Sequence, residues 1–224
     1  MQISHLFAGK PQPFGSRGAP SSIIKTPFSA LNVRFTGALE DEQGNKKLHG
    51  GPYMAIHQYA QASYPLLNQY FSSPKTVIGI GSIGENLSAP NMDEDTVFIG
   101  DQYQIGEVIL EVASPRAPCS KINYRYGVNK MDVFVAQHGI TGWYFSVRQE
   151  GKMHVNDTIR LIHRENMPVS VKQIWQIRQM IKQLPDKDSI EQWLALADTA
   201  INTPALAPEW QAYVNRAASK LAKQ

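Results

Sequence analysis

Short apolar runs alternate with glycine and proline turns through residues 1–167. The runs are rich in β-branched and aromatic residues, and runs of this kind between turn residues are typical of strands. Many short strands separated by turns favour a barrel or a sandwich over alternating strands and helices, so we expect a mainly β fold with few helices, one of them around 56–71. The predicted strands are Ser22–Lys25, Leu31–Phe35, Thr76–Ile80, Val97–Ile99, Val108–Ala113, Val133–Ala136, Tyr144–Val147 and Thr158–His163.

Residues 168–224 follow a different pattern, in which apolar positions recur at helical spacing. Ser170, with Gln173 three positions later, matches the capping box that is typical of a helix start. Asp188 predicts the start of a second helix by the same pattern. Pro208, a residue favoured at the first helical position, predicts a third helix. The pattern therefore predicts a segment of three helices.

Composition changes at the same place in the chain. All 16 glycines lie at or before Gly151, whereas three of the four tryptophans lie after it. We therefore predict two units, a β domain over residues 1–167 and a small three-helix domain over residues 168–224. One tryptophan falls on each predicted helix, which indicates either a small shared core or docking of the helices onto the β domain.

Length and composition exclude several classes of protein. The chain has 224 residues, of which 42% are hydrophobic and 18% charged, and this balance excludes wholesale disorder. No stretch of the chain has the ~20 predominantly apolar residues of a membrane span. The N-terminal residues lack the basic and apolar regions of a secretory signal, so we expect a cytoplasmic protein without a membrane partner. A formal net charge of +3 is too small to predict a nucleic-acid partner.

Three glycines match the pattern of dinucleotide-binding loops, Gly79, Gly81 and Gly84. That motif requires a helix directly after it, because the helix N-terminus receives the pyrophosphate. Pro90 limits any such helix to about one turn. We therefore reject nucleotide binding at these glycines.

The sole cysteine, Cys119, lies in a proline-rich loop after a predicted strand, with Arg116 and Lys121 on either side. A single cysteine excludes an intramolecular disulfide and a multi-cysteine metal site. Neighbouring cations favour the thiolate over the thiol. A rigid thiolate of this kind suits a nucleophile, a redox sensor or a ligand of a soft metal, and an inert buried cysteine is the alternative.

A second polar turn carries His49, Gly50 and Gly51 in front of a predicted helix. Adjacent glycines allow the backbone to approach a ligand closely, and a helix N-terminus favours anions. The alternative interpretation is an ordinary turn.

Several short motifs follow one another in a fixed order. They are Ile24-Lys25-Thr26-Pro27, His49-Gly50-Gly51-Pro52, Gly81-x-x-Gly84-Glu85-Asn86-Leu87, Gly100-Asp101, Pro115-Arg116-x-Pro118-Cys119-x-Lys121, Gly139-x-Thr141-Gly142-Trp143-Tyr144 and Gly151…Asn156-Asp157. In this combination the chain resembles the MOSC domain family, which is named after the C-terminus of molybdenum cofactor sulfurase. Within the family it is most similar to the bacterial YiiM-like branch, in which a three-helix segment follows the barrel. The resemblance covers nearly the whole chain.

The resemblance implies a β-barrel that binds molybdenum cofactor, a pterin dithiolene with a phosphate tail. By its place in the motif, Cys119 is expected to be the molybdenum ligand and a catalytic residue. Lys25, Arg116 and Lys121 match positions expected to line the pterin phosphate or the oxo groups of the metal. The residues expected to border the cofactor are Thr26, His49, Gly50, Gly51 and Asn86.

The same resemblance implies reduction of N-hydroxylated compounds, of the hydroxylaminopurine or amidoxime type. The departing nitrogen needs a proton, and His49 or His57 is expected to supply it because histidine titrates near neutrality. The chain shows no flavin, haem or iron–sulfur motif, so an external flavoprotein or ferredoxin-type electron donor is the implied partner. One position departs from the family pattern. Ser146 stands where relatives often have arginine, we do not expect Arg148 to replace it, and the substrate range stays open.

Two other functions fit the same residues. In the first, the chain is a carrier of molybdenum cofactor or of sulfur, without turnover of its own, and Cys119 relays sulfur as a persulfide. In the second, the chain binds no molybdenum and Cys119 is a redox-sensing thiol.

Overall fold

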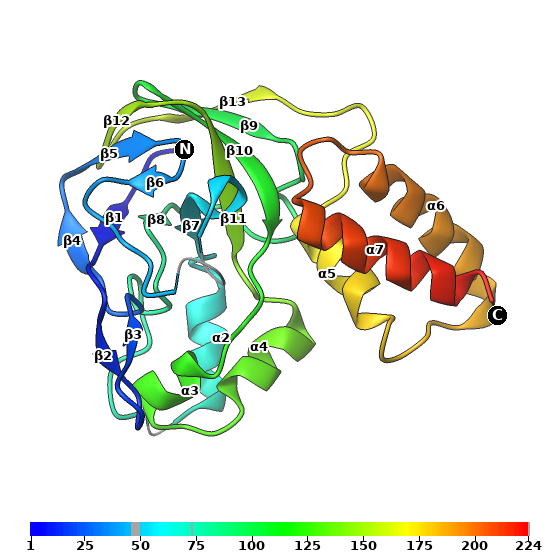
Figure 1. Cartoon of the computed structure of the whole chain (residues 1–224), viewed down its shortest axis with the longest axis horizontal. Coiled ribbons are helices and arrows are strands. Elements are labelled where there is room, and N and C mark those ends of the chain that lie inside the picture. The colour runs from blue at the N-terminus through cyan, green and yellow to red at the C-terminus, as the bar shows by residue number, and fades with distance from the viewer. Residues whose placement is uncertain (46–49, 73, 224) are drawn as a thin grey trace.

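The computed structural model describes residues 1–45, 50–72 and 74–223, and its main feature is a curled eight-stranded sheet that forms half a barrel (Figure 1). Neighbouring strands run antiparallel except for β7 and β8, which are parallel. This architecture confirms the predicted mainly β fold class. In their order across the sheet, the strands are β13 (Ile159–His163), β9 (Gln102–Ile105), β10 (Val108–Pro115), β11 (Trp143–Gln149), β7 (Ile56–Gln58), β8 (Leu87–Ser88), β1 (His5–Ala8) and β4 (Thr26–Phe28).

Two smaller sheets complete the β structure. One contains β12 (Gly151–His154), β5 (Ala30–Arg34) and β6 (Gly37–Ala38), and the other is the hairpin of β2 (Gln12–Phe14) and β3 (Ala19–Ser21). The hairpin lies beside helix α3 (Lys121–Tyr126), where the rings of Phe14 and Tyr124 meet edge to face, 5.3 Å apart (Figure 1).

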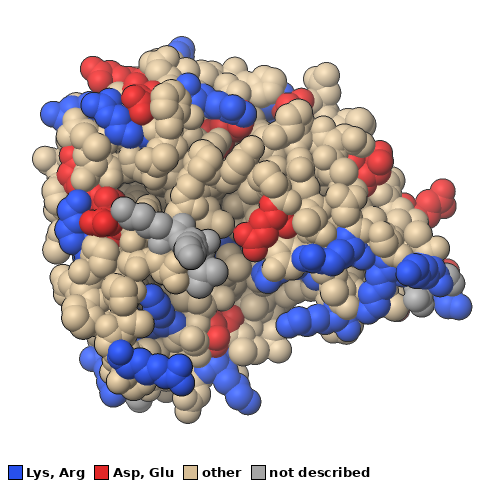
Figure 2. Space-filling model, in the orientation of Figure 1, with Lys and Arg blue, Asp and Glu red and all other residues tan. Residues whose placement is uncertain are grey.

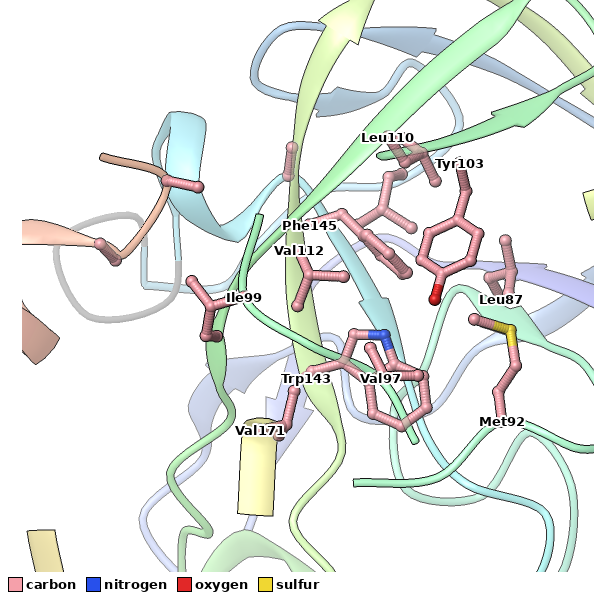
Figure 3. Close-up of a cluster of buried hydrophobic side chains, with 14 of the residues drawn as sticks. Leu87, Met92, Val97, Ile99, Tyr103, Leu110, Val112, Trp143, Phe145 and Val171 are labelled. Atoms are coloured by element: carbon pink, nitrogen blue, oxygen red, sulfur yellow. The ribbon is translucent and has the colours of Figure 1, made fainter. Parts of the chain in front are cut away.

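Inward-facing side chains of β10 and β11 form the centre of the core (Figure 3). Trp143 and Phe145 are both buried, with ring centroids 6.4 Å apart, and Leu110 and Val112 pack beside them. Full burial of one such side chain stabilises the fold by about 1.5–3 kcal/mol. Because side chains alternate along a strand, Tyr144 between the two buried rings faces the other side of the sheet.

A second buried cluster lies under the open end of the sheet, between helices α2 (Ser63–Tyr70), α3 and α4 (Met131–His138). A short 3-10 helix, η1 (Pro52–Met54), precedes strand β7. These elements pack against the segment before β8 and the one that follows β10.

The three C-terminal helices are present as predicted: α5 (Val171–Gln179), α6 (Ile190–Ile201), which follows the short 3-10 helix η2 (Lys187–Ser189), and α7 (Pro208–Leu221). The capping box at the start of α5 is formed, since the Gln173 N–H donates to the Ser170 hydroxyl and the Ser170 N–H donates to the Gln173 side chain. Pro208 is the first residue of α7. In the described part of the chain, no helix has both the length and the apolar character of a membrane span.

The helices dock onto the half-barrel and share its core. The Trp175 indole donates a hydrogen bond of 2.7 Å to the Ala136 carbonyl, and the Ala207 N–H donates one of 3.0 Å to the Ala113 carbonyl. Trp175 and Trp210 belong to the same buried cluster as Trp143. Of the two alternatives for the tryptophans, docking is the observed one, and the division into domains at residue 168 stays a prediction.

Five predicted elements differ from the structure. The predicted strand Val133–Ala136 lies inside helix α4, whose Met131, Phe134 and Val135 are buried at helical spacing. The helix expected over 56–71 begins only at Ser63, because its first residues form strand β7. The ranges 22–25 and 76–80 form no strand, and range 97–99 contributes a single β-bridge, at Phe98.

Candidate functional site

A solvent-open pocket lies where β7, β11, the 83–86 turn and the loop after β10 meet the 21–25 and 41–45 segments, and its empty space, open solvent included, is about 620 Å³. We call it the Cys119 pocket. Two lining residues that the sequence analysis did not assign to the site are Asp41 and Tyr144. The Cys119 pocket brings together six of the predicted site residues: Lys25, His57, Asn86, Arg116, Cys119 and Lys121.

Cys119 is partly buried in the five-residue loop between β10 and α3. The loop is fixed at its start, where the Arg116 N–H donates to the Gly142 carbonyl at 2.9 Å, and at its end, where the Cys119 carbonyl accepts from the Ile122 N–H at 3.2 Å. Prolines at positions 115 and 118 restrict the backbone further. The thiol therefore occupies a defined position at the pocket wall.

Arg116 is buried beneath this loop, with 7% of its surface exposed. Its guanidinium hydrogen bonds to Tyr144 and interacts electrostatically with Cys119. Within the described residues, its Nη1 atom has no hydrogen-bond partner. Buried polar groups are almost always paired, and an unpaired buried donor is costly. The geometry therefore leaves a cationic donor available to a ligand in the pocket.

Tyr144 contributes a phenol to the pocket from β11. Burial raises its pKa, although hydrogen bonding and charge from Arg116 act in the opposite direction, so the phenol keeps its proton at neutral pH. Its ring lies 5.2 Å from that of His57. The alternation of Trp143, Tyr144 and Phe145 along the strand is the sequence signal that points to this residue.

His57 is buried on β7 beside Asn86. The backbone N–H of His57 donates to the Asn86 side-chain oxygen at 3.1 Å, and the backbone carbonyl of His57 accepts from the Asn86 backbone N–H at 2.8 Å. Burial holds the pKa of His57 well below its usual value, and the charges of Arg116 and Lys25 lower it further. The imidazole is therefore neutral at neutral pH, which argues against its expected role as a proton donor. Its Nε2 atom has no partner among the described residues.

Asp41 connects two residues of the pocket wall with the segment at Gly9. It forms an ion pair with Lys25, accepts a hydrogen bond of 3.0 Å from the Asn86 amide and accepts one of 2.8 Å from the Gly9 N–H. Burial lowers the pKa of Lys25, and Asp41 opposes this shift. No motif marks Asp41, because its partners are distant in the sequence. Much of the Lys25 charge is balanced by the protein itself.

Lys121 lines the pocket and donates to the Pro20 carbonyl at 3.2 Å, which ties α3 to the β2–β3 hairpin. Three other predicted residues lie elsewhere. Thr26 is exposed on β4, where its hydroxyl donates to the Ala8 carbonyl at 3.4 Å. Gly50 and Gly51 line a neighbouring hollow that shares Asp41 with the Cys119 pocket. His49 lies outside the described residues.

The glycine-rich turn before β8 is held by Glu85, which is fully buried. Its carboxylate accepts hydrogen bonds from the Gly81 N–H at 2.6 Å and the Ile83 N–H at 3.0 Å, and it also pairs with the Tyr64 hydroxyl. A strand follows this turn, not a helix. The carboxylate therefore occupies the backbone donors that a dinucleotide motif would offer to phosphate.

Ser146 and Arg148 lie away from the pocket. Arg148 forms an ion pair with Glu111 on the neighbouring strand, with a Nε–Oε2 distance of 2.8 Å. The Ser146 hydroxyl donates to the Glu111 carbonyl at 3.4 Å. Arg148 is thus engaged on the strand pair and does not line the Cys119 pocket.

Three comparisons with known proteins, by family model, by sequence and by structure, each find similar proteins. The family model described as "MOSC domain" matches residues 45–160. Protein YiiM of Escherichia coli is 32% identical over 160 residues, which cover 71% of each chain. The crystal structure of YiiM from Geobacillus stearothermophilus superposes with a TM-score of 0.74 at 25% identity and covers 97% of this chain and 98% of that one. A protein of Gibberella moniliformis named "Reductase" is 37% identical over 130 residues, which are 58% of this chain and 23% of that protein.

Proposed function

The chain belongs to the MOSC domain family, and from this premise we propose that it is a reductase of N-hydroxylated compounds that holds molybdenum cofactor in the Cys119 pocket. Cys119 is the proposed ligand of the metal. The proposal includes an external electron donor and a cytoplasmic location.

The observation that carries the proposal is the buried Arg116 guanidinium beside the Cys119 thiol. One of its nitrogen atoms has no partner in the described chain, and an anion in the pocket would pair it. A thiolate is a suitable ligand for a soft metal centre that receives further sulfur from its cofactor. The donor set of one thiol, a buried guanidinium and Lys121 therefore fits an anionic pterin dithiolene.

When bound, the cofactor supplies the two-electron chemistry that converts R–NH–OH and two protons to R–NH₂ and water. The chain's own residues would hold it: Cys119 at the metal, and Arg116 and Lys121 at its anionic groups. The Tyr144 phenol is protonated and hydrogen bonded to Arg116, so it is the group best placed to donate a hydrogen bond or a proton to the departing nitrogen. Neutral His57 offers a hydrogen-bond acceptor instead.

The comparisons support an oxidoreductase role. The Gibberella moniliformis relative is named a reductase, although the matching segment is 23% of that protein. An electron donor must then dock from outside. Lys and Arg side chains gather on the visible face of the C-terminal helices (Figure 2). Arg216, Lys220 and Lys223 line a hollow at the C-terminal end of α7. Such a surface suits an acidic electron-transfer protein.

The decisive experiment measures molybdenum per chain by elemental mass spectrometry after expression in molybdate-replete cells. Cys119→Ala is compared with wild type, and Ser120→Ala, an exposed neighbour, is the matched control. We expect one molybdenum per chain in wild type and control and almost none in Cys119→Ala. The loaded protein is then reduced chemically and mixed with an amidoxime, and we expect its oxidation with release of the amidine. If the wild type holds molybdenum but the amidoxime does not oxidise the reduced protein, the result would instead favour the carrier function. Absence of molybdenum from folded wild type would favour the thiol sensor.

A further inference from the structure

Glu94 is a buried carboxylate in the segment between β8 and β9, and it is not among the described residues that line the Cys119 pocket. Its Oε1 atom accepts a hydrogen bond of 2.6 Å from the Gly142 N–H. Burial of a carboxylate opposes folding unless the group is well paired, so a buried carboxylate outside the pocket needs a specific reason. The hydrogen bonds around Gly142 supply this reason.

The backbone of Glu94 is fixed from two sides. The turn that contains it is closed by Asp93, whose carboxylate accepts from the Thr96 N–H at 2.9 Å. The Glu94 carbonyl accepts a hydrogen bond of 2.7 Å from the N–H of Lys172, the second residue of α5. The Glu94 side chain therefore extends toward Gly142 from a backbone that the C-terminal helices help to hold.

Gly142 connects Glu94 to the loop that carries Cys119. The Gly142 carbonyl accepts from the Arg116 N–H and from the Thr141 hydroxyl, both at 2.9 Å. Its φ is +71°, and a Cβ atom there would lie 2.6 Å from the Gln58 carbonyl oxygen, so only glycine fits this close approach. The N–H and the carbonyl of one residue thus join Glu94 to Arg116, the first residue of the loop.

Loss of the acceptor at position 94 would leave the Gly142 N–H buried without a partner, which is costly. The Gly142 backbone would then shift toward another acceptor and move the carbonyl that holds Arg116. Arg116 carries the buried guanidinium beside Cys119. A displacement of about 1 Å in such a group can lower a reaction rate on the order of 100-fold.

We propose that Glu94 is a positioning residue, which fixes the Cys119 loop (residues 116–120) and the Arg116 guanidinium through Gly142. This role depends on the reach of the side chain to the Gly142 N–H and not on its charge. The effect on the geometry of the loop stands by itself, whereas the consequence for cofactor binding rests on the proposed function.

The test compares two variants of the full chain that separate reach from charge. Glu94→Gln keeps the reach and removes the charge, whereas Glu94→Asp keeps the charge and is one methylene too short. Hydrogen exchange of the Arg116 amide is measured by NMR at pH 8, where a carboxyl with a pKa of about 7 is ionised. We expect exchange about tenfold faster than wild type in Glu94→Asp and near the wild-type rate in Glu94→Gln.

Two references separate this local effect from a general loss of stability. The Val112 amide, which donates to the Asp101 carbonyl at 3.0 Å, monitors opening of β10 itself. Glu191→Asp, at an exposed position in the first turn of α6, is the matched control and should change neither amide. Equal acceleration of the Arg116 and Val112 amides in Glu94→Asp would overturn the proposal. So would faster Arg116 exchange in Glu94→Gln with none in Glu94→Asp, because charge would then be the property that matters.

Molybdenum per folded chain is measured on the same samples. We expect Glu94→Asp to retain about tenfold less than wild type and Glu94→Gln to retain the wild-type amount. Absence of molybdenum from wild type would contradict the proposed function alone, since the exchange rates still decide the positioning role. Molybdenum in wild type together with unchanged Arg116 exchange in Glu94→Asp would contradict the positioning role alone.

Discussion

Lys25 and Asp41 form a buried ion pair in the wall of the Cys119 pocket, each with only 5% of its side chain exposed. Asp41 also accepts hydrogen bonds from Asn86 and from the Gly9 N–H. A buried carboxylate with several partners fixes the relative positions of the segments that carry them. The ion pair therefore stabilises the shape of the pocket and contributes little to its net charge.

Asp41→Asn is expected to lower the free energy of unfolding by about 3 kcal/mol, because it leaves the Lys25 ammonium buried without a counter-charge. Urea denaturation of the variant and of wild type measures the change. Asp188→Asn, at an exposed position, is the control and should stay within about 0.5 kcal/mol of wild type. A loss as small as that of the control would show that the pair does not contribute to stability.

Because of Glu94, we expect the free energy of unfolding to depend on pH. The residue is 3% exposed, and its carboxylate accepts a hydrogen bond of 2.6 Å from the Gly142 N–H. Burial raises its pKa from 4.5 to about 7, against the hydrogen bonds and the charge of Lys172. The folded carboxyl thus binds its proton more tightly than the unfolded one, and the free energy of unfolding falls as the pH rises between these two values.

Glu94→Gln removes this titration and keeps an oxygen for the Gly142 N–H. Between pH 5 and pH 7, the wild type is expected to lose on the order of 2 kcal/mol more than the variant. Urea denaturation at several pH values measures both slopes, with Glu191→Gln as an exposed control. Parallel slopes for wild type and Glu94→Gln would rule out the shifted pKa.

The fold was predictable from the sequence where local pattern and packing agree. The alternation along β11 and the capping box at Ser170 are examples, because the residues involved are neighbours in the chain. The run Val133–Ala136 has strand-forming residues, yet burial of Phe134 and Val135 against α2 and α3 makes it helical. Tertiary contacts of this kind are not visible in local pattern.

The candidate site was predictable only where motifs carry it. Cys119, Arg116 and Lys121 lie within one short loop and helix start, so the sequence shows their proximity directly. Asp41 shows no such signal, because it meets Lys25 and Asn86 across 16 and 45 positions of the chain. How the C-terminal helices dock was not predictable either, because the sequence left two arrangements open for them.

Tyr144→Phe removes the hydroxyl that is hydrogen bonded to Arg116 and leaves the ring in place. With molybdenum loaded, the variant is expected to lose about 100-fold in kcat with an artificial electron donor, the lower end for loss of a proton donor. Molybdenum content should stay at the wild-type level. Tyr124→Phe, at an exposed position, is the control. Unchanged kcat in Tyr144→Phe would exclude the phenol as the proton donor.

Removal of residues 168–224 tests whether the half-barrel folds alone. The deletion takes away Val171, Ile174, Trp175 and Trp210, which pack in the same cluster as the barrel core. At about 1.5–3 kcal/mol for each buried side chain, the loss is comparable to the 5–15 kcal/mol that stabilises a typical domain. We expect the fragment 1–167 to be unfolded or aggregated by circular dichroism and size-exclusion chromatography. A chain that ends at Leu221, after the last turn of α7, is the control and should fold like wild type. A fragment 1–167 that unfolds cooperatively at the wild-type temperature would instead establish the barrel as an independent domain.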